Sequence, residues 1–433
     1  MNRAQSDQAS PRVTKPIWVQ PWGYREGAWI AGGLLLVGFA LQWVGGGLQS
    51  QALAWPVNVV VALVFSGILV LVHVVAPQAD LVVWLRRIPA TICALALVTV
   101  LALLMGLVLQ DDEAAAPWIR RLGLASLTTS WPFLFGMCFF LATLGMATVN
   151  RLIPCRLKDI GFLLNHLGLY VAVLAGLMGA PDVERWLMEL REGELVWTAT
   201  NAEGHAHEMP LALELIRFEK EEFAPKLVKV ETDTHRIVPD TLAHVIEIGD
   251  EVEGRIGAWD VTVLRFHALA MPIGDRYEPV FDQGAGPAAR IRAVHDATGE
   301  VREGWITCGS FAFPHELLAV DDDLSLAMTV PRASAYRSRA ILYTPDADAE
   351  EIVIEVNRPY AAAGWKLYQY SYDDRFGRWS RTSIIECIRD PWLPVVYGGI
   401  YMLLAGAVYL MFMGRKPWSP PPEKGQEGRH ATV

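Results

Sequence analysis

The chain has 433 residues, of which 52% are hydrophobic, and a formal net charge of −10. Its length allows two or three domains, and an acidic, strongly apolar composition excludes nucleic acid as a favoured partner. The charge is unevenly placed: residues 182–390 contain 38 acidic and 22 basic side chains, whereas the rest contains 9 and 15. This split predicts an acidic aqueous domain attached to a membrane part with basic flanks.

Six apolar runs are each close to the roughly 20 residues that a bilayer core requires. They cover residues 28–47, 57–76, 88–109, 131–150, 159–180 and 392–413. The sequence therefore predicts an α-helical bundle of about six transmembrane helices. The first run begins after 27 residues and lacks a small-residue cleavage site, so we interpret it as an anchor and not as a cleaved signal.

These runs divide the chain into five parts. The expected parts are an N-terminal segment at 1–27, five transmembrane helices within 28–180, a polar domain at 181–390, a final helix at 391–414 and a disordered tail at 415–433. Basic residues gather in alternate connections, including Arg86 and Arg87, and then Arg151, Arg156 and Lys158. The positive-inside rule then places both termini in the cytoplasm and residues 181–390 outside it.

The polar domain is predicted to be mostly β, either a sandwich or an open barrel. Short stretches rich in β-branched and aromatic residues alternate with Gly, Pro, Asp and Asn, which is typical of strands and turns. Examples are residues 195–200, 210–223, 244–249, 259–269, 351–357 and 365–372. Residues 321–323 and 345–351 are acidic and are interpreted as solvated loops.

Common catalytic motifs are absent from the sequence. It has no Gly-rich nucleotide loop, no HExxH, no GxSxG and no CxxC or CxxCH motif. Cys93 and Cys138 fall inside apolar runs, and Cys155 lies in a predicted cytoplasmic connection. Cys308 and Cys387 both fall in the outer domain, where an oxidising compartment would permit a disulfide.

Two histidines lie within the apolar runs. His73 is near the inner end of the second run, and His166 is in the inner half of the fifth. One interpretation is that each bonds a neighbouring group, Asn165 being a candidate companion for His166. The other is that they are axial ligands of haem iron, for which a histidine nitrogen is a standard ligand. In the outer domain, His205 and His207 could form a metal-binding pair, although such pairs are more often polar loops.

The stretch 364–391 is Tyr-rich and runs directly into the last apolar segment. Simple alternation predicts Tyr368, Tyr370 and Tyr372 on one face of a strand, with the intervening side chains on the other. Asp390 is expected near the N-terminus of the final helix, where a negative charge is favoured. The stretch is then a rigid link between the outer domain and the membrane.

This same region resembles the ResB/CcsB family of cytochrome c biogenesis proteins. The family pattern is a V-N-x-P turn, a Gly, a Y-Q-x-S-Y-D strand and an R-D-P sequence before the last helix. The matching residues are Val356, Asn357, Pro359, Gly364, Tyr368, Gln369, Ser371, Tyr372, Asp373, Arg389, Asp390 and Pro391. Residues 162–182 and 215–226 also look like the family, although five runs before the outer domain exceed the number in many members.

The resemblance implies a ResB-like component of the system II cytochrome c synthase, in the bacterial cytoplasmic (inner) membrane. Such a component is an accessory subunit of a haem lyase complex. It handles haem b as a transient, transported substrate for covalent attachment to CxxCH apocytochrome c. The implied partners are a ResC/CcsA-like membrane protein, apocytochrome c, a thioredoxin-like reductant and membrane lipids. His73 is the first candidate ligand of the haem iron and His166 the second.

Two alternatives remain open at the sequence level. One is a cofactor-free, membrane-anchored adaptor or sensor whose external β domain binds a protein. The other is a small-molecule transporter, which is less favoured because the apolar runs hold very few ionisable groups besides the two histidines.

Overall fold

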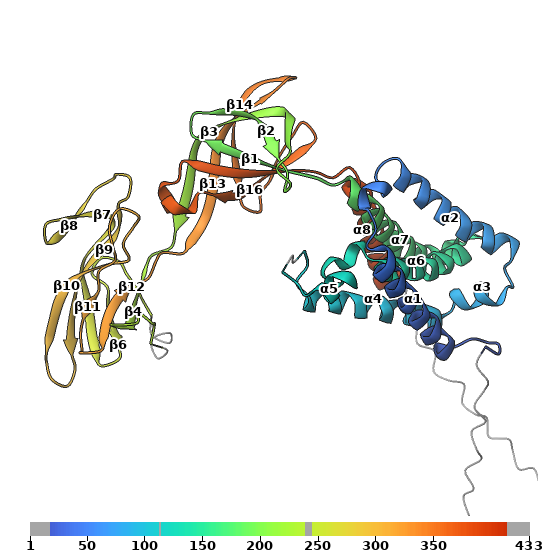
Figure 1. Ribbon diagram of the computed structural model, residues 1–433, viewed down its shortest axis with the longest axis horizontal. Helices are drawn as coiled ribbons and strands as arrows, with labels where there is room; N and C mark the ends of the chain where they lie inside the picture. The colour runs from blue at the N-terminus through green and yellow to red at the C-terminus, as the bar shows by residue number, and fades with distance from the viewer. Residues whose placement is uncertain (1–17, 112–113, 239–244, 414–433) are drawn as a thin grey trace, which may run out of the picture. The chain divides into compact units, whose positions relative to one another are not determined.

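The computed structural model describes residues 18–111, 114–238 and 245–413. The chain divides into a helical unit, which comprises residues up to Val183 and from Asp390 onward, and a β unit at Glu184–Arg389 (Figure 1). The predicted tail at 415–433 and most of the segment at 1–27 lie outside the described residues. The fold class predicted from the sequence, a helical membrane bundle with a mostly β domain, is confirmed.

Within the described residues, six helices are long and apolar enough to cross a membrane. They are α1 Tyr24–Gly45, α2 Val57–Val75, α4 Ile88–Leu107, α6 Trp131–Leu152, α7 Ile160–Gly179 and α8 Leu393–Met413. Shorter helices are α3 Asp80–Leu85, α5 Pro117–Arg121, η1 Ser50–Leu53, η2 Leu124–Thr129, η3 Leu157–Asp159, η4 Ala180–Asp182 and, in the β unit, η6 Asp374–Trp379. The chain is therefore a multi-pass membrane protein with five spans before the β unit and one after it.

Helix α6 is the most buried span, and α1, α2, α4 and α7 contact it. Its surface carries small residues at these contacts: a Cβ on Gly145 would lie 2.5 Å from Leu69 of α2 and 3.0 Å from Tyr170 of α7. In lipid, helices associate through such close packing because burial of apolar surface gives no advantage over lipid contact. Large apolar side chains on the outward faces, such as Leu63 and Leu103, are exposed as membrane contact requires.

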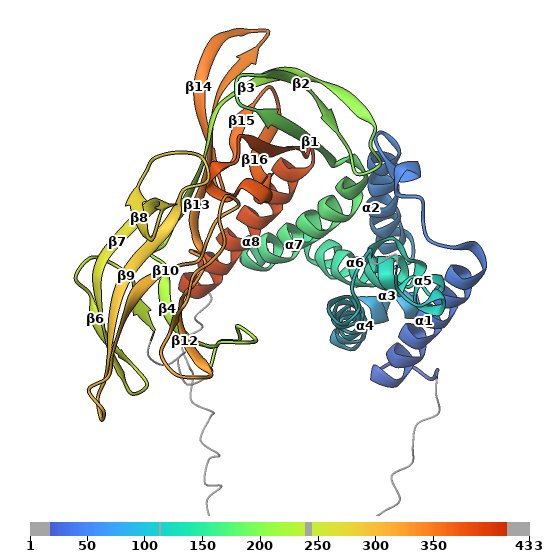
Figure 2. The same ribbon diagram turned by 60° about the vertical axis from the view of Figure 1, so that its left-hand side comes forward.

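Helices α7 and α8 approach each other closely along two glycines (Figure 2). A Cβ on Gly168 would lie 2.6 Å from the carbonyl oxygen of Gly399. A Cβ on Gly399 would in turn lie 2.6 Å from the backbone nitrogen of Ala172. Gly399 of the last span therefore permits a backbone-to-backbone contact that a larger residue would block.

The β unit begins and ends in one eight-stranded antiparallel sheet, in the order β14-β13-β3-β2-β1-β17-β16-β15. Its strands are β1 Glu184–Arg191, β2 Leu195–Thr200, β3 Ala206–Glu222, β13 Ala333–Thr344, β14 Ala347–Glu355, β15 Tyr360–Ala362, β16 Trp365–Tyr372 and β17 Thr382–Arg389. Alternate residues of β3, from Met209 to Leu215, point into one core with members of the other strands. The end strands β14 and β15 meet, where the Tyr360 hydroxyl donates to Glu350 at 2.9 Å. The sheet is therefore nearly closed, like a barrel.

Residues 226–238 and 245–328 form a sandwich inserted between β3 and β13. A five-stranded sheet (β10-β9-β7-β6, with β8 paired to β7) packs over a four-stranded sheet (β11-β12-β4-β5) around one core. The strands are β4 Lys226–Glu231, β5 Ile246–Glu247, β6 Glu253–Ile256, β7 Trp259–Ile273, β8 Arg276–Pro279, β9 Gly286–His295, β10 Val301–Thr307, β11 Leu318–Ala319 and β12 Leu324–Met328. The β unit thus combines both architectures that the sequence left open.

The predicted common face of three tyrosines on β16 is wrong for Tyr372. The pairing of β16 with β17 shifts between Gln369 and Ser371, so Tyr370 is an extra, bulged residue. A bulge reverses the alternation of side chains that follow it. Tyr372 consequently lies on the same side of the sheet as Gln369, where it stacks on Phe218 with ring centroids 4.9 Å apart.

The acidic segment at 345–351 is also not the loop that its composition predicts. Strand β14 starts at Ala347, and Ala347, Glu350 and Glu351 pair with β13 across a shift in register, although their side chains are exposed. A hairpin that projects into water carries polar side chains on both faces, so composition alone does not separate it from a loop. Residues 321–323, by contrast, form an exposed bend as expected.

Candidate functional site

The end of the bundle from which the chain leaves at Val183 and returns at Asp390 is called the β-domain end below, and the opposite end the far end. At the β-domain end, Asp182 accepts three hydrogen bonds. The donors are the backbone N–H of Trp55, the side-chain amide of Asn58 and the indole N–H of Trp392, each at 2.7 Å. One carboxylate thereby joins the starts of α2 and α8 to the end of α7.

Two neighbouring residues complete this junction. Asn58 is fully buried, and its amide also donates to the Met178 carbonyl at 2.9 Å. Asp390 accepts from the backbone N–H groups of Trp392 and Leu393 at 3.0 Å and so caps α8, which confirms its predicted place. Sequence reasoning missed Asp182 and Asn58; the available signal was an acidic residue and an amide at the ends of two apolar runs.

The two histidines lie in the far half of the bundle. Asn58 of α2 contacts Met178 of α7. Eight residues further along α2, Ser66 bonds Tyr170, which lies eight residues back along α7, and 2.9 Å separates the two hydroxyl oxygens. Antiparallel α2 and α7 thus share a continuous register. His73 follows Ser66 by seven residues and His166 precedes Tyr170 by four, spacings that return to the same helix face.

Both histidines therefore lie on the helix faces that carry the Ser66–Tyr170 contact. With a rise of 1.5 Å per residue, His73 is about 10 Å and His166 about 6 Å from that contact, both toward the far end. The similar depth expected from the sequence agrees with this register. The helices bring the two side chains to neighbouring levels of one side of the bundle.

The ring of His166 is held in a defined orientation. It stacks on Phe162 with centroids 3.7 Å apart, and the guanidinium of Arg151 covers Phe162 at 4.9 Å. Its Nδ1 lies 3.1 Å from the Phe162 carbonyl oxygen, which accepts only, so Nδ1 carries the proton. In a neutral ring this leaves Nε2 as the unprotonated nitrogen, the form in which histidine binds a metal.

Asn165 is not the companion of His166 that the sequence suggested. Its amide donates to the Gly161 carbonyl at 3.2 Å, and its side chain lies against Gly406 of α8. Adjacent residues on a helix point about 100° apart, so the two side chains bond separate carbonyls, each four residues back.

His73 is buried, with 9% of its surface exposed, and its Nδ1 has no hydrogen-bond partner among the described residues. A buried imidazole nitrogen without a partner is destabilising. An added ligand that the ring could bind would offset that cost. The tautomer of His166 and the unsatisfied Nδ1 of His73 are the two observations that bear on the predicted ligands.

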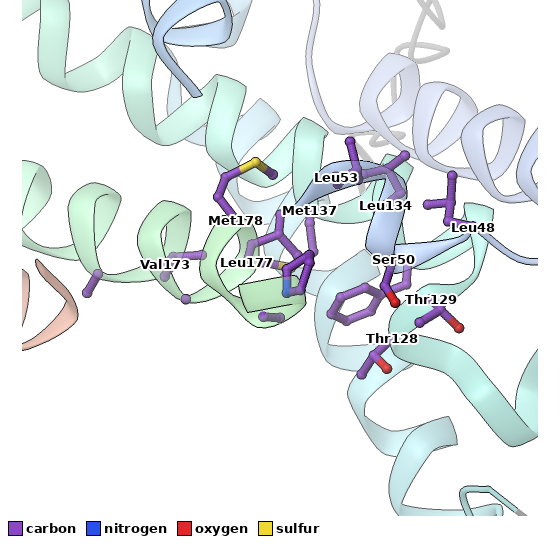
Figure 3. A pocket seen from close by; sticks show the side chains of 15 residues that line it. Leu48, Ser50, Leu53, Thr128, Thr129, Leu134, Met137, Val173, Leu177 and Met178 are labelled. Carbon is purple, nitrogen blue, oxygen red and sulfur yellow. The ribbon is translucent and has the colours of Figure 1, made fainter. Parts of the chain in front are cut away.

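Two apolar cavities of about 350 and 360 Å³ open at the β-domain end. Figure 3 shows the first, where the hydroxyls of Ser50, Thr128 and Thr129 lie on one side and Val173 and Leu177 on the other. Neither cavity is lined by His73 or His166. The structure therefore places the cavities and the predicted ligands at different levels of the bundle.

The remaining chemical candidates are in the β unit. Cys308 and Cys387 are free thiols in separate cores: Cys387 lies in the barrel core, and Cys308 packs against the sandwich core. Burial raises the pKa of Cys387 to about 12 and that of Cys308 to about 11, so both thiols stay protonated at neutral pH. His207 stacks on Trp186 at 4.7 Å, and the described residues contain no group of three or more metal-capable side chains.

No family model matches the chain, and no curated protein matches it. Among solved structures, the chain is similar to one described as cytochrome c heme lyase CcmF, at 13% identity and a TM-score of 0.22. The match covers 91% of this chain and 46% of that one, so the chain spans less than half of that protein's length. A TM-score of this size does not establish a shared fold, and it assigns no function to this chain.

The fold and the junction define a class: a multi-pass membrane protein with a barrel and a sandwich attached between its fifth and sixth spans.

Proposed function

We propose that this chain is a ResB/CcsB-like component of the system II cytochrome c synthase. The observation that carries the proposal is the sequence block at 356–391, whose residues match the family pattern from the V-N-x-P turn to R-D-P. In the fold, this block comprises β15, β16, η6, β17 and the cap of α8. The resemblance therefore lies where the β unit joins the last span.

We propose further that the protein lies in the bacterial cytoplasmic membrane with the β unit outside. The far end carries the basic connections, with Arg86, Arg87, Arg151, Arg156 and Lys158 in or beside them. Basic residues favour the cytoplasmic side. The far end would then face the cytoplasm, with both termini on that side, and the β unit would be extracytoplasmic.

In this orientation His73 and His166 would meet haem in the cytoplasmic half of the membrane. Haem is then a transported substrate, held at its iron by an imidazole nitrogen and surrounded by apolar helix faces. The protonated Nδ1 of His166 and the unpartnered Nδ1 of His73 support these roles. The protein would act as an accessory subunit of the haem lyase complex.

The proposed partners follow from the same resemblance. A ResC/CcsA-like protein would complete the complex, reduced CxxCH apocytochrome c would receive the haem, and a thioredoxin-like protein would keep its cysteines reduced. The acidic β unit outside the membrane would be the part available to these external proteins.

The test is the absorption spectrum of the protein purified together with a ResC-like partner. The proposal predicts a Soret band and reduced bands of a bis-histidine haem, with the haem content falling by about half or more in His73→Ala or His166→Ala, since loss of an axial ligand weakens retention. His205→Ala, an exposed histidine of the β unit, is the matched control. A colourless complex, or equal haem content in all variants, would refute the ligand assignment.

A further inference from the structure

One part of the barrel sheet has an open edge. Strand β3 pairs with β13 along residues 217–222. On the other side of β3, the pairing with β2 extends only to Glu214. One further bridge joins Leu215 to Glu192. Among the described residues, no further strand pairs with this side of residues 216–222, which we call the open edge.

The open edge presents backbone groups that seek partners. In an antiparallel ladder, the N–H and C=O groups of alternate residues point to opposite sides of the strand. About half of the backbone groups of the open edge therefore point away from β13, over a length of about 24 Å at 3.4 Å per residue. Such a row is a template for another extended chain.

A cleft of about 840 Å³ lies along the open edge. The open edge forms part of its lining. Residues 378–381, at the end of η6 and directly after it, and Phe281 and Gln283 before β9 form other parts. Figure 1 shows β3 and β13 leaving the barrel together on their way to the sandwich. An extended chain is the form of polypeptide that pairs with such an edge.

An exposed aromatic side chain stands in this cleft. Phe281 is 75% exposed, and its ring meets the indole of Trp379 edge-on at 5.6 Å. The indole is fixed because its N–H donates to the Ala285 carbonyl at 2.9 Å. A large exposed ring beside an immobilised one is a suitable contact for an apolar side chain of a ligand.

The charges of the cleft neutralise one another. Its lining includes four acidic and four basic side chains. Glu222 pairs with Lys220 at 2.9 Å and with Arg378 at 3.5 Å, and Arg381 pairs with Glu192 at 3.0 Å. No excess of one charge remains to select an acidic or basic ligand, so the backbone edge and the aromatic pair are the features left for recognition.

We propose that the open edge and its cleft bind an extended, unfolded polypeptide segment. The segment adds a strand to β3 and places an apolar side chain against Phe281. Naming the client as reduced, haem-free cytochrome c rests on the proposed function; the docking of an extended chain rests on the open edge alone.

The test is hydrogen–deuterium exchange of the full chain in nanodiscs, with reduced, haem-free cytochrome c as the probe. We expect slower exchange at residues 216–222 with this unfolded probe and no change with folded, haem-containing cytochrome c. Phe281→Ser should weaken binding about tenfold, as loss of an aromatic anchor does. Val301→Ser removes an exposed apolar residue of β10 outside the cleft lining and should bind as the wild type does.

A second unfolded chain, reduced and carboxymethylated α-lactalbumin, separates the two proposals. Protection of residues 216–222 by either unfolded chain supports docking at the open edge, and protection by neither overturns it. Wild-type affinity in Phe281→Ser overturns the aromatic anchor. Normal maturation of c-type cytochromes in cells that lack this gene overturns the proposed function and leaves the docking proposal standing.

Discussion

At the scale of single residues, Asp182 joins three segments of the helical unit, a role that sequence reasoning did not foresee. Its carboxylate bonds groups from α2 and α8 at the point where α7 ends. Charge-assisted hydrogen bonds are stronger than neutral ones, and an interior amide such as Asn58 loses a partner when the acceptor is removed.

Asp182→Ala should therefore destabilise the helical unit by about 2 kcal/mol. The measurement is the thermal unfolding midpoint of the purified protein in detergent, followed by tryptophan fluorescence. Asp80→Ala, at an exposed position of α3, serves as the control and should unfold near the wild-type temperature. An Asp182→Ala midpoint equal to that of the control would show that the three bonds contribute nothing.

At the scale of elements, the sequence predicted helices better than strands. The six spans were found to within a few residues because a bilayer sets both their length and their composition. The first residues of strand β14 (347–350) were taken for a loop because a hairpin in water needs no apolar face, although residues 351–357 were predicted as a strand. The orientation of Tyr372 was wrong because one bulged residue at Tyr370 reverses the alternation. Bulges depend on pairing with a distant strand, which local sequence does not encode.

The contact of α7 with α8 gives the sharpest test at this scale, since adjacent glycines of α8 have opposite surroundings. A Cβ on Gly399 would meet the backbone of α7 at 2.6 Å, whereas a Cβ on Gly398 has nothing within 4 Å. Gly399→Ala should lower stability by about 2 kcal/mol through overpacking. Gly398→Ala should be neutral or slightly stabilising because alanine favours a helix.

The two variants are compared by thermal unfolding in the same detergent. Both variants add one methyl group, at adjacent positions of α8. A difference between their unfolding midpoints therefore reports the close approach of the α7 and α8 backbones. Equal midpoints for Gly399→Ala and Gly398→Ala would mean that α7 and α8 do not pack along Gly168 and Gly399.

At the scale of the whole molecule, the sequence indicated the candidate histidines but not their setting. The apolar runs located His73 and His166 within spans, and the register of α2 and α7 shows that they share neighbouring levels. The cavities at the β-domain end, the junction at Asp182 and the open edge of β3 all arise from contacts between distant segments. No pattern within one segment reports such contacts, so they could not be predicted.

The central claim is that this protein takes part in attaching haem to c-type cytochromes. The most direct measurement is covalent haem on a CxxCH reporter in cells that lack the gene and then receive it on a plasmid. We expect haem attachment to be lost without the gene, restored by the wild-type chain and reduced at least about tenfold by the double variant His73→Ala and His166→Ala, since both proposed iron ligands are removed. Normal haem attachment in the cells without the gene would contradict the account.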